Sequence, residues 1–154
     1  MIQMADESVL PTMEQLKRII EYIPYFENRH NKFFDYIPPE ENKNGTSHFP
    51  YYIYSEKVSD FISCLEEHKF LVSPYDQKCV RKYFSLLKGE IDSSELGILD
   101  IRNIFSFLLN ADRFCEGQIA RAINKGIFLK MLKRIEQIAI EIQVPLSNNS
   151  KTEI

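Results

Sequence analysis

Long hydrophobic runs and paired cysteines are both missing from this sequence of 154 residues. No stretch approaches the roughly 18 uncharged apolar residues of a membrane-spanning helix, and the N-terminus lacks the basic start and apolar run of a signal peptide. The three cysteines, Cys64, Cys79 and Cys115, are odd in number and far apart, unlike the pattern of a disulfide framework. We therefore expect a soluble cytoplasmic protein with reduced thiols.

Excess positive charge and metal-ligand patterns are also lacking. The formal net charge is −3, so the chain has no overall basic field of the kind that most nucleic-acid binders carry. The three histidines, His30, His48 and His68, do not pair with each other or with a cysteine at metal-ligand spacing. No complete catalytic constellation is present. We expect no bound metal and no cofactor.

Helical signals dominate what is present. Thr12 and Gln15 form a capping-box pattern, Ser55 is a second N-cap, and Phe128 to Ile142 carry an amphipathic face. These patterns predict an all-α fold: a single domain of five or six helices at residues 12–143, with a flexible N-terminus at 1–11 and a disordered tail at 144–154. The Ser73 to Asp76 segment predicts a helix start with an N-cap, proline and an acid in the first turn.

Residues 28–54 do not follow the helical pattern. Aromatic clusters at 33–37 and 49–54 flank Asn44-Gly45, a dipeptide typical of hairpin turns. The spacing predicts a minor extended or hairpin element near residues 32–54, with residues 38–47 mobile.

Residues 112–117 crowd acids, a cation, an aromatic ring, a thiol and a glycine between two helical segments. If Phe114 anchors in the core, Arg113 is held ready to bind a carboxylate or phosphate. Alternatively, Asp112 or Glu116 caps the next helix and Arg113 pairs with one of them. Cys115 is interpreted as a buried structural cysteine rather than a nucleophile.

The aromatic cluster at 49–54 supplies two more candidate residues, Tyr52 and Tyr54. Their rings could line a pocket for a planar ligand or a peptide, and a lid packed over the helices is an equal interpretation. The candidate ligand-binding residues are therefore Arg113, Cys115, Glu116, Tyr52 and Tyr54.

Residues 118–135 partly match a DNA-binding helix-turn-helix, with Gly126 at the turn. Lys130, Lys133 and Arg134 would form the basic face. However, Phe128 stands where polar groups should face the groove, and solvated lysines opposite an apolar stripe are usual on surface helices.

The acid-Arg-Phe-Cys-acid-Gly sequence at 112–117, with Tyr51 to Ser55 and the glycine-broken helix pair around Gly126, resembles a family of small uncharacterised prokaryotic and phage proteins. The resemblance covers most of residues 12–140. It implies no activity, fold or ligand, but it implies that Arg113, Phe114, Glu116 and Gly117 matter for folding or for function.

Three functional hypotheses follow. The first is a non-enzymatic protein-interaction or regulatory module with a protein partner, because no catalytic set is complete. The second is a small-ligand protein or enzyme that binds an anionic metabolite or nucleotide through Arg113 and Glu116. The third is DNA binding through residues 118–135.

Overall fold

The computed structural model describes residues 10–41, 45 and 47–152, of which residues 41, 47, 48 and 143–152 are described in their backbone only. It confirms the predicted fold class, a mostly α-helical single domain with a small antiparallel hairpin. The predicted flexible N-terminus at 1–11 lies largely outside the described residues.

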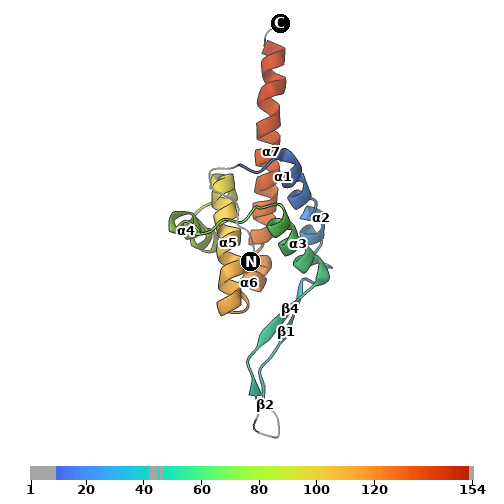
Figure 1. The fold of residues 1–154 in the computed structure, drawn as a ribbon, viewed down its shortest axis with the longest axis vertical. Helices are drawn as coiled ribbons and strands as arrows, with labels where there is room; N and C mark the ends of the chain where they lie inside the picture. Colours follow the sequence, from blue (N-terminus) through green and yellow to red (C-terminus); the bar gives the residue numbers. More distant parts are fainter. Residues whose placement is uncertain (1–9, 42–44, 46, 153–154) are drawn as a thin grey trace.

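The helices account for most of the described chain (Figure 1). Their bounds are α1 Met13–Ile20, α2 Ile23–Glu27, α3 Glu56–Glu67, α4 Gln77–Leu87, the 3₁₀ turn η1 Ser93–Glu95, α5 Ile98–Phe114, α6 Gln118–Asn124 and α7 Ile127–Thr152. The strands are β1 Phe34–Ile37, β2 Glu40–Glu41, β3 Ser47–His48 and β4 Tyr51–Tyr54. None of the helices in the described residues combines the length and apolar character that crossing a bilayer requires.

Local capping chemistry explains where several helices begin. The Thr12 hydroxyl accepts from the Gln15 backbone N–H at 3.2 Å, and the Gln15 side chain accepts from the Thr12 N–H at 2.8 Å, which confirms the predicted capping box. Ser55 caps α3 as predicted. The predicted helix start at Ser73 is wrong, because Asp76 is itself the N-cap of α4 and accepts from the Lys78 N–H at 2.8 Å.

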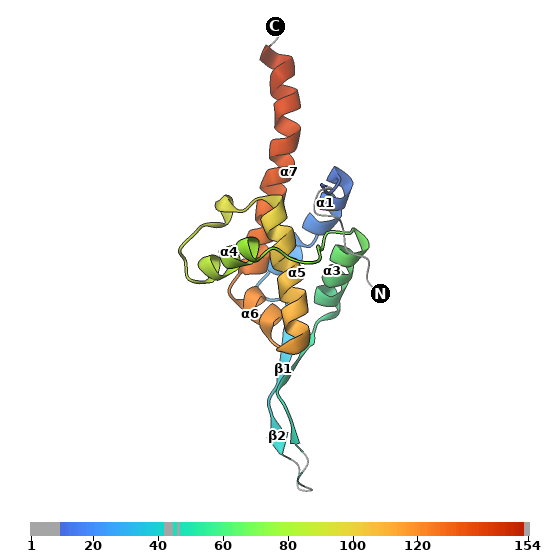
Figure 2. The ribbon, with the colours of Figure 1, turned by 60° about the vertical axis from the view of Figure 1, so that its left-hand side comes forward.

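The core lies around α5, which runs through the middle of the helical body (Figure 2). Its apolar stripe is fully buried, and Phe105 packs edge-on against Phe61 of α3 and Phe128 of α7, with ring centroids 5.7 and 5.2 Å apart. Packing of this kind between three helices that are far apart in sequence makes the body one cooperative unit.

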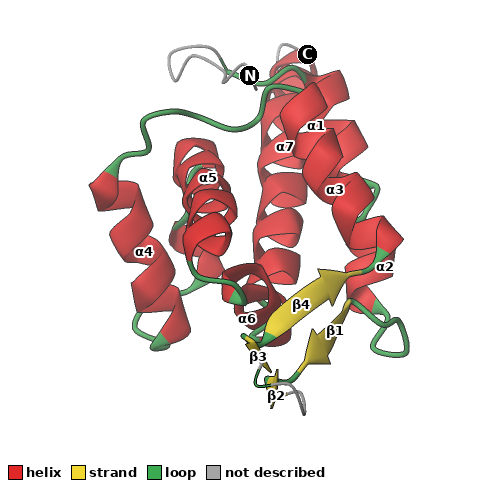
Figure 3. Cartoon of the chain, turned by 60° about the horizontal axis from the view of Figure 1, so that its bottom comes forward, coloured by secondary structure: helices red, strands yellow, loops and turns green. Residues whose placement is uncertain are grey.

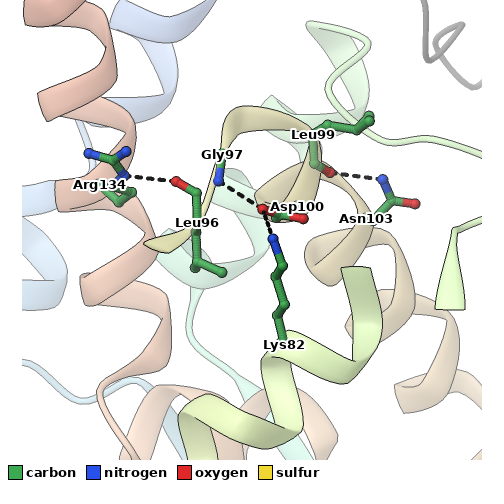
Figure 4. Close-up of polar contacts among 7 residues, drawn as sticks. All are labelled: Lys82, Leu96, Gly97, Leu99, Asp100, Asn103 and Arg134. Atoms are coloured by element: carbon green, nitrogen blue, oxygen red, sulfur yellow. Dashed lines mark hydrogen bonds and ion pairs between the residues drawn. The ribbon is translucent and has the colours of Figure 1, made fainter. Parts of the chain in front are cut away.

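Charged and polar groups join α4, α5 and α7 at the N-terminal end of α5 (Figure 4). Asp100 accepts hydrogen bonds from Lys82 and from the Gly97 N–H, both at 2.8 Å. Burial opposes ionisation of Asp100, but hydrogen bonds from Lys82, the Gly97 N–H and the Cys79 thiol, together with the charge of Lys82, hold its pKa below the ordinary value. On the α7 side, Arg134 donates to the carbonyl of Leu96 at 2.8 Å.

The predicted hairpin is present and projects from the helical body on the side opposite the C-terminal part of α7 (Figures 1 and 2). β1 pairs antiparallel with β4, with Phe34 opposite Tyr54 and Tyr36 opposite Tyr52. We call residues 34–54 the arm. β2 pairs with β3 within and just beyond the segment 38–47 predicted to be mobile; residues 42–44 and 46 of that segment lie outside the described part.

The predicted division between a domain ending at 143 and a disordered tail stays a prediction. The backbone of α7 continues as one helix to Thr152, and residues 153–154 lie outside the described part.

Candidate interaction site at the base of the arm

The junction between α5 and α6, residues 112–117, is built around the carboxylate of Asp112. One oxygen of this side chain accepts from the backbone N–H groups of Gly117 and Ile119, both at 3.1 Å. Both donors are part-buried N–H groups at the start of α6 that would otherwise lack an intrahelical partner. Asp112 therefore caps α6 from the preceding helix, as one of the two sequence interpretations expected. The other half of that interpretation, a pair between Arg113 and Asp112 or Glu116, is wrong among the described residues.

The same carboxylate joins the junction to the arm. The Tyr54 hydroxyl donates to Asp112 at 3.0 Å and accepts from the Ala120 N–H at 3.2 Å. Burial, followed by the neighbouring charge of Asp112, raises the pKa of the Tyr54 hydroxyl, so it stays protonated and can donate. Tyr54 thus acts as a bridge between strand β4 and the first turn of α6.

Glu116 makes a second connection between the junction and the arm. Its carboxylate accepts from the Tyr52 backbone N–H at 3.2 Å. Gly117 follows with φ of 99°, a left-handed conformation that favours glycine, and a Cβ placed on it would lie 2.8 Å from the Tyr52 ring. The close approach of this ring to the backbone explains why a glycine stands here.

The structure corrects the expected role of Phe114. Phe114 does not anchor in the core, because its side chain is 85% exposed. Arg113 is also exposed, and its guanidinium makes no ion pair or hydrogen bond with the described residues. Arg113 is therefore accessible, but no buried neighbour holds it in place.

Cys115 is exposed rather than buried, so its interpretation as a buried structural cysteine is wrong. It ends α5 in an extended conformation and lies 3.5 Å from the side-chain amide of Gln118. Because Cys115 follows the last residue of α5, it does not continue the buried stripe of that helix.

The arm carries an aromatic ladder on one face, formed by Phe34, Tyr36, Tyr52 and Tyr54. Ring centroids along this face are 5.4 Å apart for Phe34 and Tyr52 and 5.1 Å apart for Tyr36 and Tyr52. Cross-strand aromatic pairs of this kind stabilise a two-stranded sheet that has few other contacts. Of the predicted site residues, the structure brings Tyr52, Tyr54 and Glu116 together; Arg113 and Cys115 stay outside the hydrogen-bonded cluster.

The arm also exposes large apolar side chains. Phe49 is 90% exposed, Ile53 51% and Tyr36 50%, and Phe114 stands at the base of the arm. Ile53 lies on the opposite face of the arm from Tyr36, and Phe114 is the last residue of α5 rather than part of the arm. The exposed apolar groups are therefore spread over both faces and the base of one projecting element. We call these four residues the exposed arm surface.

The basic face predicted for DNA binding is largely engaged within the protein. Lys133 pairs with Glu27 at 3.4 Å, and Arg134 pairs with Glu141 at 3.5 Å besides its bond to Leu96. α6, Gly126 and α7 do form a helix-turn-helix connection, but Phe128 is only 1% exposed and cannot enter a groove. Lys130 remains exposed.

One polar cluster was missed by the sequence reasoning. Arg102, Asn103 and Ser106 are buried on α5 and hold the segment between α3 and α4. Arg102 donates to the Phe70 carbonyl at 2.9 Å, and the Ser106 hydroxyl accepts from the Val72 N–H at 2.8 Å. The only signal was polar residues beside the apolar stripe of α5, which an exposed helix face shows equally well.

Comparison with known proteins adds a family but no activity. A family model described as a family of unknown function, DUF6508, matches residues 11–141. No curated protein and no solved structure matches the chain. The match spans the helical body, the arm and the junction, so the chain belongs to this family of unknown function, DUF6508.

Proposed function

We propose that this protein is a non-enzymatic interaction module that binds a protein partner through the arm. The observation that carries the proposal is the exposed arm surface, Tyr36, Phe49, Ile53 and Phe114. Aromatic side chains are enriched at protein interfaces because they bury large areas with few rotatable bonds.

The anchoring of the arm supports this function. Tyr54 and Glu116 fasten β4 to the junction through hydrogen bonds of 3.0 and 3.2 Å. An isolated two-stranded hairpin is marginal in water, so these bonds hold the arm in one orientation before a partner arrives. A pre-positioned surface loses less conformational freedom on binding, which favours affinity.

Affinity capture with matched variants tests the proposal. Phe114→Ser removes an 85% exposed ring, and Leu99→Ser on α5 is the control because Leu99 is exposed but lies away from the arm. Wild-type protein and Leu99→Ser should retain the same partner from a host lysate, whereas Phe114→Ser should lose it. Retention of that partner by all three proteins would refute a role for the exposed arm surface.

A small-ligand function is the second candidate, and a cavity favours it. A cavity of about 430 Å³ lies between α2 and the α6–α7 corner, within the size range of ligand pockets. Phe26, Phe33 and Phe128 supply aromatic lining and Arg29 a cation, and the carboxylate of Glu27, which also lines the cavity, is paired with Lys133. Arg29 could therefore hold an aromatic anion here. Thermal-shift screening against aromatic carboxylates tests it, because a ligand selective for the folded state raises Tm. No shift with any of them would count against it.

A further inference from the structure

The two edges of the arm differ in their free hydrogen-bonding groups. The Ser55 N–H donates to the Phe33 carbonyl at 2.9 Å, across the two strands. The Tyr52 N–H donates instead to the Glu116 carboxylate, on the side of β4 away from β1. Because bonded and non-bonded pairs alternate along an antiparallel ladder, the pairs of Phe34 with Tyr54 and of Tyr36 with Tyr52 are the non-bonded ones. The backbone N–H and C=O groups of these four residues therefore point outward.

The outer edge of β4 is covered by the junction, where Glu116 occupies the Tyr52 N–H. Figure 3 shows β4 between α6 and β1, which leaves the outer edge of β1 on the side away from α6. Among the described residues, no hydrogen bond reaches the outward N–H or C=O of Phe34 or Tyr36. An open strand edge of this kind is a template for pairing with another extended chain.

We propose that the outer edge of β1 binds an extended segment of a different protein as an added antiparallel strand. This inference rests on the proposed interaction function and names the groups that make the contact. Phe34 and Tyr36 each offer one donor and one acceptor, so a segment paired with them forms up to four backbone hydrogen bonds.

The side chains of β1 define the chemistry of this segment. Residues opposite Phe34 and Tyr36 lie on the aromatic face of the arm, where β-branched or aromatic side chains pack best. The residue between them lies opposite Asp35 on the other face. Asp35 is exposed, and its ion pair with Lys32 is a solvent-exposed pair of little energy, so a basic residue at this position can still complement the carboxylate. The partner segment therefore alternates apolar, basic and apolar residues.

A second copy of this chain fits the edge poorly in symmetric antiparallel pairing. The register that places Phe34 opposite Tyr36 of the other copy sets Asp35 against Asp35, and like charges directly opposite are destabilising. The register centred on Tyr36 places Phe34 opposite Pro38, which has no N–H to donate.

The remaining symmetric register is centred on Phe34 and sets Tyr36 opposite Lys32. Lys32 lies outside β1, and its carbonyl already accepts from the Tyr25 hydroxyl at 3.0 Å. Each symmetric arrangement thus carries a penalty that a segment from another protein avoids.

The test uses an acetylated and amidated peptide, Thr-Val-Lys-Val-Thr, added to isotope-labelled full-length protein. NMR titration should shift the amide signals of Phe34 and Tyr36 and slow their hydrogen exchange. Replacing the central lysine of the peptide by glutamate should weaken binding about threefold. N-methylation of both valines, which removes the donors facing β1, should weaken binding at least about tenfold.

Variants of the protein test the same groups from the other side. Tyr36→Pro removes an outward N–H without breaking the ladder to β4, as edge prolines do, and should abolish peptide binding. Tyr36→Thr is its control because it loses the ring but keeps the N–H, and it should retain binding.

Three results of the peptide titration would overturn the inference. These are no change at Phe34 and Tyr36, equal binding of the N-methylated peptide, and protection of those amides that rises with protein concentration when no peptide is present. The last result would assign the edge to a second copy. A captured partner lost by Phe114→Ser but kept by Tyr36→Pro would contradict strand addition while leaving the proposed function intact.

Discussion

Removing the carboxylate of Asp112 should loosen both α6 and the arm. Asp112→Ala takes away the acceptor of three hydrogen bonds, from the Tyr54 hydroxyl and from the Gly117 and Ile119 N–H groups. Two of these bonds form a helix cap, and the third holds the arm. Asp112→Asn is the matched control, because its amide oxygen can still accept.

The expected magnitude follows from these contacts. Loss of an N-cap costs about 1 kcal/mol in the free energy of unfolding. Loss of the bond from the half-buried Tyr54 costs about 1 kcal/mol more. Asp112→Ala should therefore destabilise the protein by about 2 kcal/mol, and Asp112→Asn by about half of that.

A double-mutant cycle separates the arm contact from the cap. Urea unfolding followed by far-ultraviolet circular dichroism gives the free energy for wild type, Asp112→Ala, Tyr54→Phe and the double variant. The coupling energy between the two positions should be about 1 kcal/mol. Additive effects, or an Asp112→Ala variant within about 0.3 kcal/mol of wild type, would refute the role of Asp112 as the bridge.

Three further predictions concern the junction and the thiols. Gly117→Ala should lower the free energy of unfolding by at least about 1 kcal/mol, because of its positive φ and its close contact with Tyr52, and urea unfolding measures this. Titration with a thiol reagent should detect Cys115 alone in the native protein and all three cysteines in denaturant; fast native reaction of Cys64 or Cys79 would contradict their burial. Burial raises the pKa of the Cys64 thiol to about 11 and that of the Cys79 thiol to about 12. The stability that the buried neutral thiols contribute is therefore complete below pH 9.0 and is lost as pH rises through those values. Thermal melts across alkaline pH should show Tm falling, and a constant Tm would contradict this prediction.

Local chemistry explains which parts of the fold could be predicted from the sequence. The Thr12 capping box and the turn at Gly126 depend on neighbouring residues only, and both stand as predicted. The start of α4 does not depend on neighbouring residues alone, because the Asp76 backbone N–H also donates to the buried side chain of Asn103 at 2.6 Å. A partner 27 residues away leaves no local signal.

The candidate site shows the same division. Of the two interpretations of residues 112–117, the helix cap is present, because Asp112 caps α6; a binding role for these residues stays a prediction. The exposure of Phe114 could not be predicted, because an aromatic residue in the last turn of a helix fits a core and a surface equally well. The binding of Glu116 to the Tyr52 N–H depends on how the arm lies against the helices, which no sequence pattern encodes.

Hydrogen exchange on the complex with the captured partner shows where that partner binds. Binding should slow exchange at residues 34–37 and 113–116, with the amides of Phe34 and Tyr36 most strongly protected. Protection confined to the exposed faces of α4 or α7, with the arm exchanging as it does in the free protein, would contradict this expectation.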